Sequence, residues 1–133
     1  MKNAFTKLLI VVPMKDPSEA KTRLKLVMSK RDRHLLAKKL FCRTLDVICD
    51  VRQRLPQREI DCVVVTSSEE IKATAQKYGA NVIREAPASS LRSALRQAVV
   101  WAEDRQYNSI LILPADLANP SPVDIVGLIS ISK

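Results

Sequence analysis

Three cationic side chains stand in one short connection after the first apolar run of the sequence. The segment PMKDPSEAKTRL occupies residues 13–24 and carries Lys15, Lys21 and Arg23. An arginine offers phosphate oxygens a two-pronged donor and a lysine offers a point charge, so the three cations could converge on a triphosphate. They would also neutralise charge that develops on an α-phosphate and on departing pyrophosphate. The connection has no glycine and is no Walker motif, and a solvated basic loop is the alternative interpretation.

An aspartate follows the last strongly apolar run of the chain. The sequence there reads Leu113-Pro114-Ala115-Asp116-Leu117. Magnesium is commonly held by one or two carboxylates together with phosphate oxygens, and an aspartate just beyond a buried strand is well placed for that purpose. A turn or helix-capping aspartate is the alternative. If both segments lie on the same side of the fold, Asp116 holds Mg²⁺ while the cations hold the phosphates.

Alternating strands and helices must position these two segments. Residues 7–12, 62–66 and 109–113 are continuous apolar runs typical of strands buried on both faces, and 81–84 is a shorter strand. Helical spacing predicts helices over 30–54, 67–78 and 90–105, and a last helix beginning at Pro120 or Pro122. Ser29 is expected to cap the first helix and Gly79 to follow the second. The pattern predicts a single α/β domain over residues 1–133, with three layers and a mostly parallel sheet.

In such sheets ligands bind beyond the carboxyl ends of the strands. The prediction therefore places the connections 13–23, 67–69 and 114–120 on one rim. The chain stops soon after the fourth strand, so the sheet is expected to be incomplete. An unpaired sheet edge needs cover, which favours a homodimer.

Composition restricts the class of protein. The longest N-terminal apolar run, Leu8–Pro13, is too short for a membrane span or a signal peptide, so we expect a cytoplasmic protein that uses no membrane. The three cysteines have no CxxC spacing, and His34 has no partner at metal-ligand spacing. Three buried, reduced thiols are therefore predicted.

The net charge of +8 is concentrated in one part of the chain. Residues 15–43 hold ten Lys or Arg and three acids, which indicates an anionic partner: nucleic acid, an acidic membrane surface or a phosphorylated small molecule. Aromatic residues make up only 4% of the chain, so a stacking platform for single strands is missing and nucleic acid is disfavoured. Helix faces in solvent explain six further cations, which are Lys25, Lys30, Arg31, Arg33, Lys38 and Lys39.

Four segments, in order along the chain, carry a resemblance to a known family. They read VVPMKDPSEAKTRL at 11–24, VVVTSSEEI at 63–71, EAP with the helix after it at 85–100, and ILILPADLANPSPVDI at 110–125. They resemble the 2-phospho-L-lactate guanylyltransferase family, which serves the biosynthesis of the deazaflavin coenzyme F-420. The P-x-K…K-[ST]-R-L and P-A-D-L elements are fairly specific in combination.

The resemblance implies a glycosyltransferase-A-like (nucleotide-diphospho-sugar transferase) fold and an activity. GTP and a phosphorylated three-carbon acid (2-phospho-L-lactate, phosphoenolpyruvate or 3-phosphoglycerate) would give a diphosphodiester and pyrophosphate, with Mg²⁺. By match to the family motifs, Lys21 and Arg23 would be catalytic and Asp116 would hold the metal. The nucleotide-binding residues carried over in the same way are Pro13, Lys15, Lys21, Arg23, Thr66, Ser67 and Glu85.

The chain also departs from the family pattern. Ser90-Leu91-Arg92 stands where relatives usually have Gly-Leu-Asn, and a serine Cβ occupies space that glycine would leave to a nucleotide. Relatives continue for a further C-terminal third, which supplies acceptor-binding residues and another acidic metal ligand. Three alternatives therefore stay open: a truncated, non-catalytic nucleotide-binding remnant, a nucleotide-sugar glycosyltransferase-like protein with a K-T-R-L motif, and a basic nucleic-acid-binding module.

Overall fold

The protein folds as four strands and three helices in strict alternation in the computed structural model, which describes residues 7–14, 29–56, 58–85 and 90–113. The last predicted helix, beginning at Pro120 or Pro122, lies outside these residues. In chain order the elements are β1 (Lys7–Pro13), α1 (Lys30–Arg54), β2 (Glu59–Thr66), α2 (Glu69–Lys77), β3 (Asn81–Arg84), α3 (Leu91–Asp104) and β4 (Ser109–Ile112).

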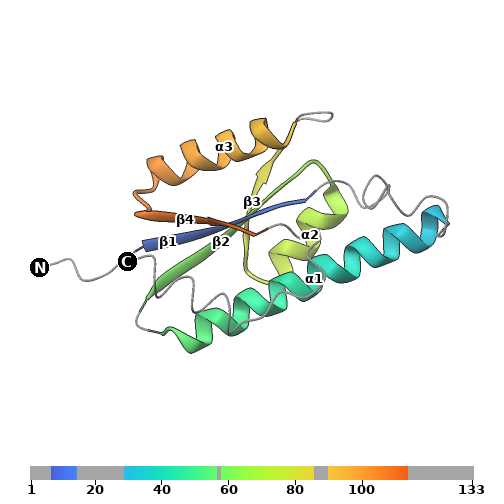
Figure 1. The fold of residues 1–133 in the computed structure, drawn as a ribbon, viewed down its shortest axis with the longest axis horizontal. Helices are drawn as coiled ribbons and strands as arrows, with labels where there is room; N and C mark the ends of the chain where they lie inside the picture. The colour runs from blue at the N-terminus through green and yellow to red at the C-terminus, as the bar shows by residue number, and fades with distance from the viewer. Residues whose placement is uncertain (1–6, 15–28, 57, 86–89, 114–133) are drawn as a thin grey trace, which may run out of the picture.

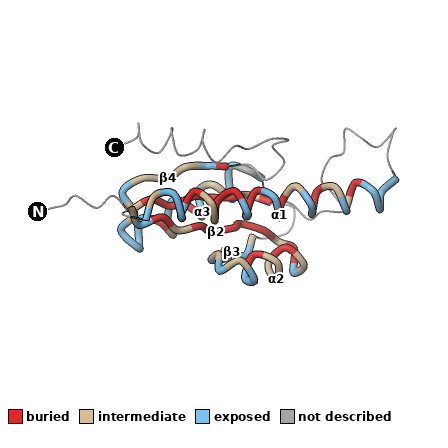
Figure 2. Tube along the Cα trace, turned by 90° about the horizontal axis from the view of Figure 1, so that it is seen from below, coloured by how far each residue is buried: buried red, intermediate tan, exposed pale blue. Residues whose placement is uncertain are grey.

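The strands form a parallel sheet in the order β3-β2-β1-β4. Figure 1 shows α3 on one face of the sheet and α1 with α2 on the other, so the predicted three-layer, parallel α/β architecture is confirmed. β1 and β2 are central and almost wholly buried (Figure 2). Among the described residues, no helix combines the length and the apolar character needed to cross a membrane.

Alternate residues of the central strands pack into two separate cores. Leu8, Ile10 and Val12 face α1 and α2, where Phe41 is fully buried. On the opposite face, Leu9, Val11, Val63 and Val65 meet the alanines of α3, which are Ala94, Ala98 and Ala102. Small residues on α3 let the helix lie close to the sheet, and two-sided burial is the reason that these strands are apolar throughout.

Side-chain caps define where the helices begin. The Ser29 hydroxyl accepts a hydrogen bond from the Asp32 N–H (3.1 Å), as predicted for α1. Ser68, rather than Ser67, caps α2, because its hydroxyl accepts from the Ile71 N–H (3.2 Å). Gly79 follows α2 with a φ of +78°, a conformation in which glycine carries no steric penalty.

Apolar spacing along α1 indicated its buried face only in part. Leu45 and Ile48 are buried, but Leu35 is 54% exposed, and Ala37 and Phe41 continue the stripe that packs on the sheet. The thiol prediction needs a similar correction. Cys62 is buried, and burial raises the pKa of its thiol to about 12, but Cys42 and Cys49 are only half-buried.

β4 was expected to be buried and is not. Ile110 and Ile112 are 37% and 45% exposed, because β4 pairs with β1 along one side only within the described residues and α3 lies over β1 and β2. Ile110 and Ile112 share the register of Leu9 and Val11, so they lie on the α3 side of the sheet. β2, in contrast, is longer than predicted and starts at Glu59.

Candidate functional site

The carboxyl ends of the strands meet at one rim of the sheet (Figure 1). Backbone hydrogen bonds extend the pairing at this rim beyond the strands themselves. The N–H of Met14, just after β1, donates to the carbonyl of Val65 (3.0 Å), and the N–H of Glu85, just after β3, donates to the carbonyl of Thr66 (2.9 Å). The end of β2 therefore holds the residues that follow both of its neighbouring strands, β1 and β3.

Four of the predicted nucleotide-binding residues come together at this rim. Pro13 is in register with Val65, next to Thr66, and Glu85 bonds to Thr66. Ser67 follows Thr66 in the turn to α2. Their juxtaposition agrees with the sequence analysis, and their contact with a nucleotide stays a prediction.

The other predicted residues lie outside the described part of the chain: Lys15, Lys21, Arg23 and Asp116. The residues that lead to them are described. Met14 precedes Lys15 and bonds to β2, while the N–H of Leu113, three residues before Asp116, donates to the carbonyl of Val11 (2.9 Å). Because β1 and β4 are parallel neighbours, the chain leaves both strands at the same edge of the sheet.

The turn between β2 and α2 is held by its own polar groups. The hydroxyl of Thr66, which is fully buried, accepts a hydrogen bond from the Ser68 N–H (3.1 Å), and the Ser68 hydroxyl caps α2. Local hydrogen bonds of this kind replace the backbone hydrogen bonds between strands where the chain turns away from the sheet. The result is a fixed turn whose backbone ends at a helix N-terminus, a position that favours anions.

The acidic side chains at the start of α2 are engaged by cations. Glu70 contacts His34 Nε2 and Lys38 Nζ of α1, each at 2.9 Å, and Arg84 of β3 lies 2.7 Å from Glu69. The Lys38 hydrogen bond is the main cause of a lowered pKa at Glu70, and in return it raises the pKa of Lys38. These carboxylates therefore add little negative charge to the rim.

Arg33 is the residue that the sequence analysis misjudged. It was grouped with solvent-facing cations, but only 8% of its surface is exposed and its Nε is buried without a hydrogen-bond partner. Lys30, Arg31 and Lys39 are exposed as expected. Arg33 precedes Ala37 and Phe41 by one and two turns on the buried stripe of α1, and that spacing is the signal by which the sequence could have shown it.

The metal prediction stays open on the residues that are described. Among them, no three His, Cys, Asp or Glu side chains gather as a metal site would require. Glu85 is the described carboxylate whose backbone bonds directly to the end of β2. Magnesium binding by Asp116, which lies outside the described residues, stays a prediction.

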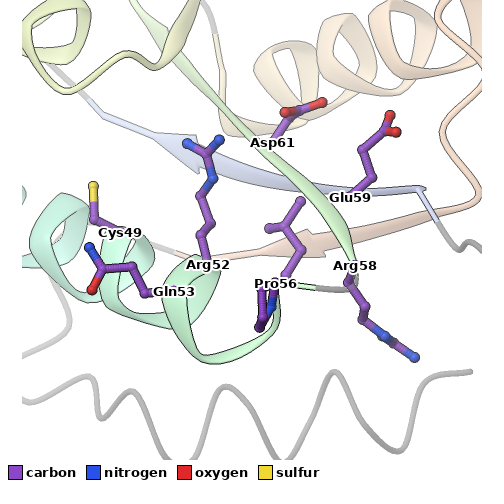
Figure 3. A pocket seen from close by; sticks show the side chains of 8 residues that line it. Cys49, Arg52, Gln53, Pro56, Arg58, Glu59 and Asp61 are labelled. Atoms are coloured by element: carbon purple, nitrogen blue, oxygen red, sulfur yellow. The ribbon is translucent and has the colours of Figure 1, made fainter.

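A cavity of about 490 Å³ lies at the opposite end of the sheet (Figure 3). It opens beside the start of β2 and the end of α1, where Arg52, Arg58, Glu59 and Asp61 bring cations and carboxylates together. Ligands of parallel α/β sheets bind beyond the carboxyl ends of the strands. We therefore do not assign this cavity to the nucleotide.

Ser90 has a structural role at the position where the family pattern has glycine. Its hydroxyl accepts a hydrogen bond from the Ser93 N–H (3.1 Å) and caps α3. Serine is among the preferred N-cap residues, and glycine there costs only a few tenths of a kcal/mol. The substitution is thus compatible with the same helix start.

Comparison with known proteins agrees with this architecture. The profile of the CofC-like guanylyl transferase family matches residues 8–133. A 3-phospho-D-glycerate guanylyltransferase of Colwellia psychrerythraea is 40% identical over 109 residues, which are 82% of this chain and 49% of that protein. A 2-phospho-L-lactate guanylyltransferase of Methanocaldococcus vulcanius is 29% identical over 127 residues, 95% of this chain and 52% of that protein.

A solved structure supports the fold independently. A Desulfovibrio desulfuricans protein assigned as a nucleotide-diphospho-sugar transferase superposes with a TM-score of 0.63 over 94% of this chain and 54% of its own, at 14% sequence identity. That likeness confirms the expected fold. The chain spans about half the length of the curated relatives it matches.

Proposed function

Because the chain belongs to the CofC-like guanylyl transferase family, we propose that it serves guanylyl transfer from GTP to a phosphorylated three-carbon acid. A phosphate oxygen of the acid attacks the α-phosphorus of GTP, the bond from that phosphorus to the bridging oxygen of the β-phosphate breaks, and pyrophosphate leaves. Supporting this proposal is the 40% identity to a 3-phospho-D-glycerate guanylyltransferase. It makes 3-phosphoglycerate the first acceptor to test, before phosphoenolpyruvate and 2-phospho-L-lactate.

The roles proposed for the site residues follow from the family resemblance and from their positions along the rim. Lys15, Lys21 and Arg23 hold the phosphates and stabilise charge on the leaving group, while Asp116 holds Mg²⁺. Thr66, Ser67 and Glu85 line the nucleotide beside them. The proposal also assigns the protein to the cytoplasm and to coenzyme F-420 biosynthesis.

Thermal-shift titration with GTP tests the binding half of the proposal. GTP at a hundred times its dissociation constant adds about 2.7 kcal/mol. For a chain of 133 residues the unfolding entropy is about 0.28 kcal/mol/K, which converts that gain to roughly 10 °C. Magnesium should increase the shift in the wild type and not in Asp116→Asn. No shift with GTP would overturn the proposed function.

Two assays separate the alternatives. Pyrophosphate release from GTP and 3-phosphoglycerate distinguishes an enzyme from a non-catalytic nucleotide-binding remnant, which binds GTP and releases nothing. A panel of sugar nucleotides tests the glycosyltransferase-like alternative. A nucleic-acid module is less favoured by the structure, because Arg33 is buried and Lys38 is paired with Glu70.

Self-association is part of the proposal and rests on β4. The strand carries no charged residue, its Ile110 and Ile112 are exposed, and edges of monomeric sheets are normally protected by charge. Antiparallel pairing of two β4 edges would be isologous and would set the isoleucines of the two copies next to each other on the α3 side of the joined sheet. A second copy of this chain is thus the proposed partner.

A further inference from the structure

Arg33 lies on the face of α1 that looks toward the sheet. Ala37, one turn later, and Phe41, two turns later, are buried in the core between α1 and the strands. Arg33 is about 6 Å further toward the helix start than Ala37. In Figure 1 the first turns of α1 extend past the carboxyl ends of the strands, so the start of α1 lies at the same end of the molecule as the rim.

Part of the Arg33 guanidinium is buried without a hydrogen-bond partner in the described structure. Its Nε has no hydrogen-bond partner, although only 8% of the residue is exposed. Glu70, the carboxylate that α2 presents to α1, is already shared by His34 and Lys38. A buried N–H group without an acceptor is costly in a folded protein, so the position indicates a site that is completed by an anion.

The start of α1 adds to that preference. α1 has 25 residues, and the partial positive charge at the N-terminus of a long helix favours anions. Arginine is suited to phosphate, because two of its N–H groups can donate in parallel to two oxygens.

We propose that Arg33 is a further substrate-contacting residue, whose guanidinium binds a phosphate group of the bound substrates at the carboxyl rim. The inference rests on the proposed function and adds a cation from α1 to those of the 13–24 connection. It requires no movement of the helix, because Arg33 is buried on the required face already.

The test compares Arg33→Met with Arg31→Met, an exposed arginine in the same turn. Three probes are titrated separately in thermal-shift and calorimetric experiments: inorganic pyrophosphate, GTP and 3-phosphoglycerate. We expect Arg33→Met to weaken binding of pyrophosphate or of 3-phosphoglycerate at least tenfold, with Arg31→Met unchanged. The probe that Arg33→Met binds more weakly identifies whether Arg33 contacts the phosphates of the nucleotide or the phosphate of the acid.

The melting temperature without anion provides a second readout. Methionine replaces a buried N–H group without an acceptor by an apolar chain of similar length, so Arg33→Met should be as stable as the wild type or more stable. If Arg33 has a purely internal role, Arg33→Met will melt lower and every probe will bind as in the wild type; that result overturns the inference. Arg33→Lys keeps the positive charge but lacks the two parallel N–H donors of the guanidinium, so its affinity for the anionic probes should be intermediate.

The two proposals fail in different ways. Binding of pyrophosphate that depends on Arg33, with no response to GTP, upholds the anion site and overturns the guanylyl transfer proposal. Binding of GTP with wild-type affinity by Arg33→Met, together with unchanged pyrophosphate and 3-phosphoglycerate binding, overturns the role of Arg33 and leaves guanylyl transfer standing.

Discussion

Replacing Tyr107 by phenylalanine should measure how the connection before β4 is held against β2. The Tyr107 hydroxyl donates to Asp61 Oδ2 at 2.6 Å. Its ring stacks on Trp101, with centroids 5.9 Å apart, and lies 4.5 Å from Lys7 Nζ. Phenylalanine keeps both ring contacts, so the substitution removes the hydrogen bond alone.

The expected cost follows from the charge and the partial burial of the pair. Hydrogen bonds to charged groups contribute about 1.5–3 kcal/mol, and the lower part of that range applies because Tyr107 and Asp61 are half-buried. We expect Tyr107→Phe to lower the free energy of unfolding by about 1.5–2 kcal/mol and the melting temperature by about 5–7 °C for a chain of this length.

The assay measures the free energy of unfolding of four proteins in urea and combines the values in a double-mutant cycle. The cycle compares the wild type, Tyr107→Phe, Asp61→Ala and the double variant, and a coupling energy of about 1 kcal/mol or more is expected. Additive effects, or a loss below about 0.5 kcal/mol in Tyr107→Phe, would refute the reasoning.

The pH dependence offers a separate check of the same bond. Burial, followed by the hydrogen bond to Asp61, raises the pKa of Tyr107 above its usual value. A raised pKa in the folded state contributes stability that is present in full below the unfolded pKa of about 10 and is lost as the pH rises above it. The difference between wild type and Tyr107→Phe should therefore be constant up to that pH and shrink beyond it.

Two further predictions concern the helices. Glu70→Gln should cost about 0.5–1 kcal/mol at pH 7, as expected for partly exposed ion pairs. Because Lys38 lowers the pKa of Glu70, this contribution is present above the ordinary glutamate pKa of about 4.3. The difference measured by urea denaturation should therefore shrink as the pH is lowered below that value. On the proposed pairing through β4, Val99→Lys should lower the fraction of dimer in light scattering more than Val100→Lys does. Val100 lines a groove with Ile83 of β3, and Val99 lies about 100° away around α3. Equal behaviour of the two variants would argue against pairing through β4.

Local signals in the sequence predicted the elements well where a cap or a stop residue marked them. Ser29 and Gly79 defined the start of α1 and the end of α2, and β3 has the predicted bounds. Exposure of Ile112 was not predictable in the same way, because it depends on which strand takes the outer position in the sheet. Strand order is a property of the whole fold and leaves no mark in a four-residue segment.

In the candidate site, too, some features could be predicted from the sequence and others depend on the whole fold. The rim itself followed from strands that are apolar throughout and therefore parallel, whereas Thr66 and Glu85 came from the family resemblance and lie beside Pro13 in the structure. Arg33 escaped the sequence analysis because charge was weighed by sequence density, whereas its burial depends on the face of α1 that meets the sheet. A cation at a buried helical position carries more information than several cations in one exposed segment.

Phosphate binding and metal binding should be separable in this protein. At the described rim, Glu69 is paired with Arg84 and Glu70 with Lys38, whereas the Nε of Arg33 has no partner. On the proposed roles, the cations bind phosphate without any metal and Asp116 alone provides for Mg²⁺. Asp116→Asn should therefore keep its affinity for pyrophosphate in metal-free buffer and lose the additional GTP affinity that magnesium confers. A variant that loses both would show that the carboxylate and the cations act as one unit.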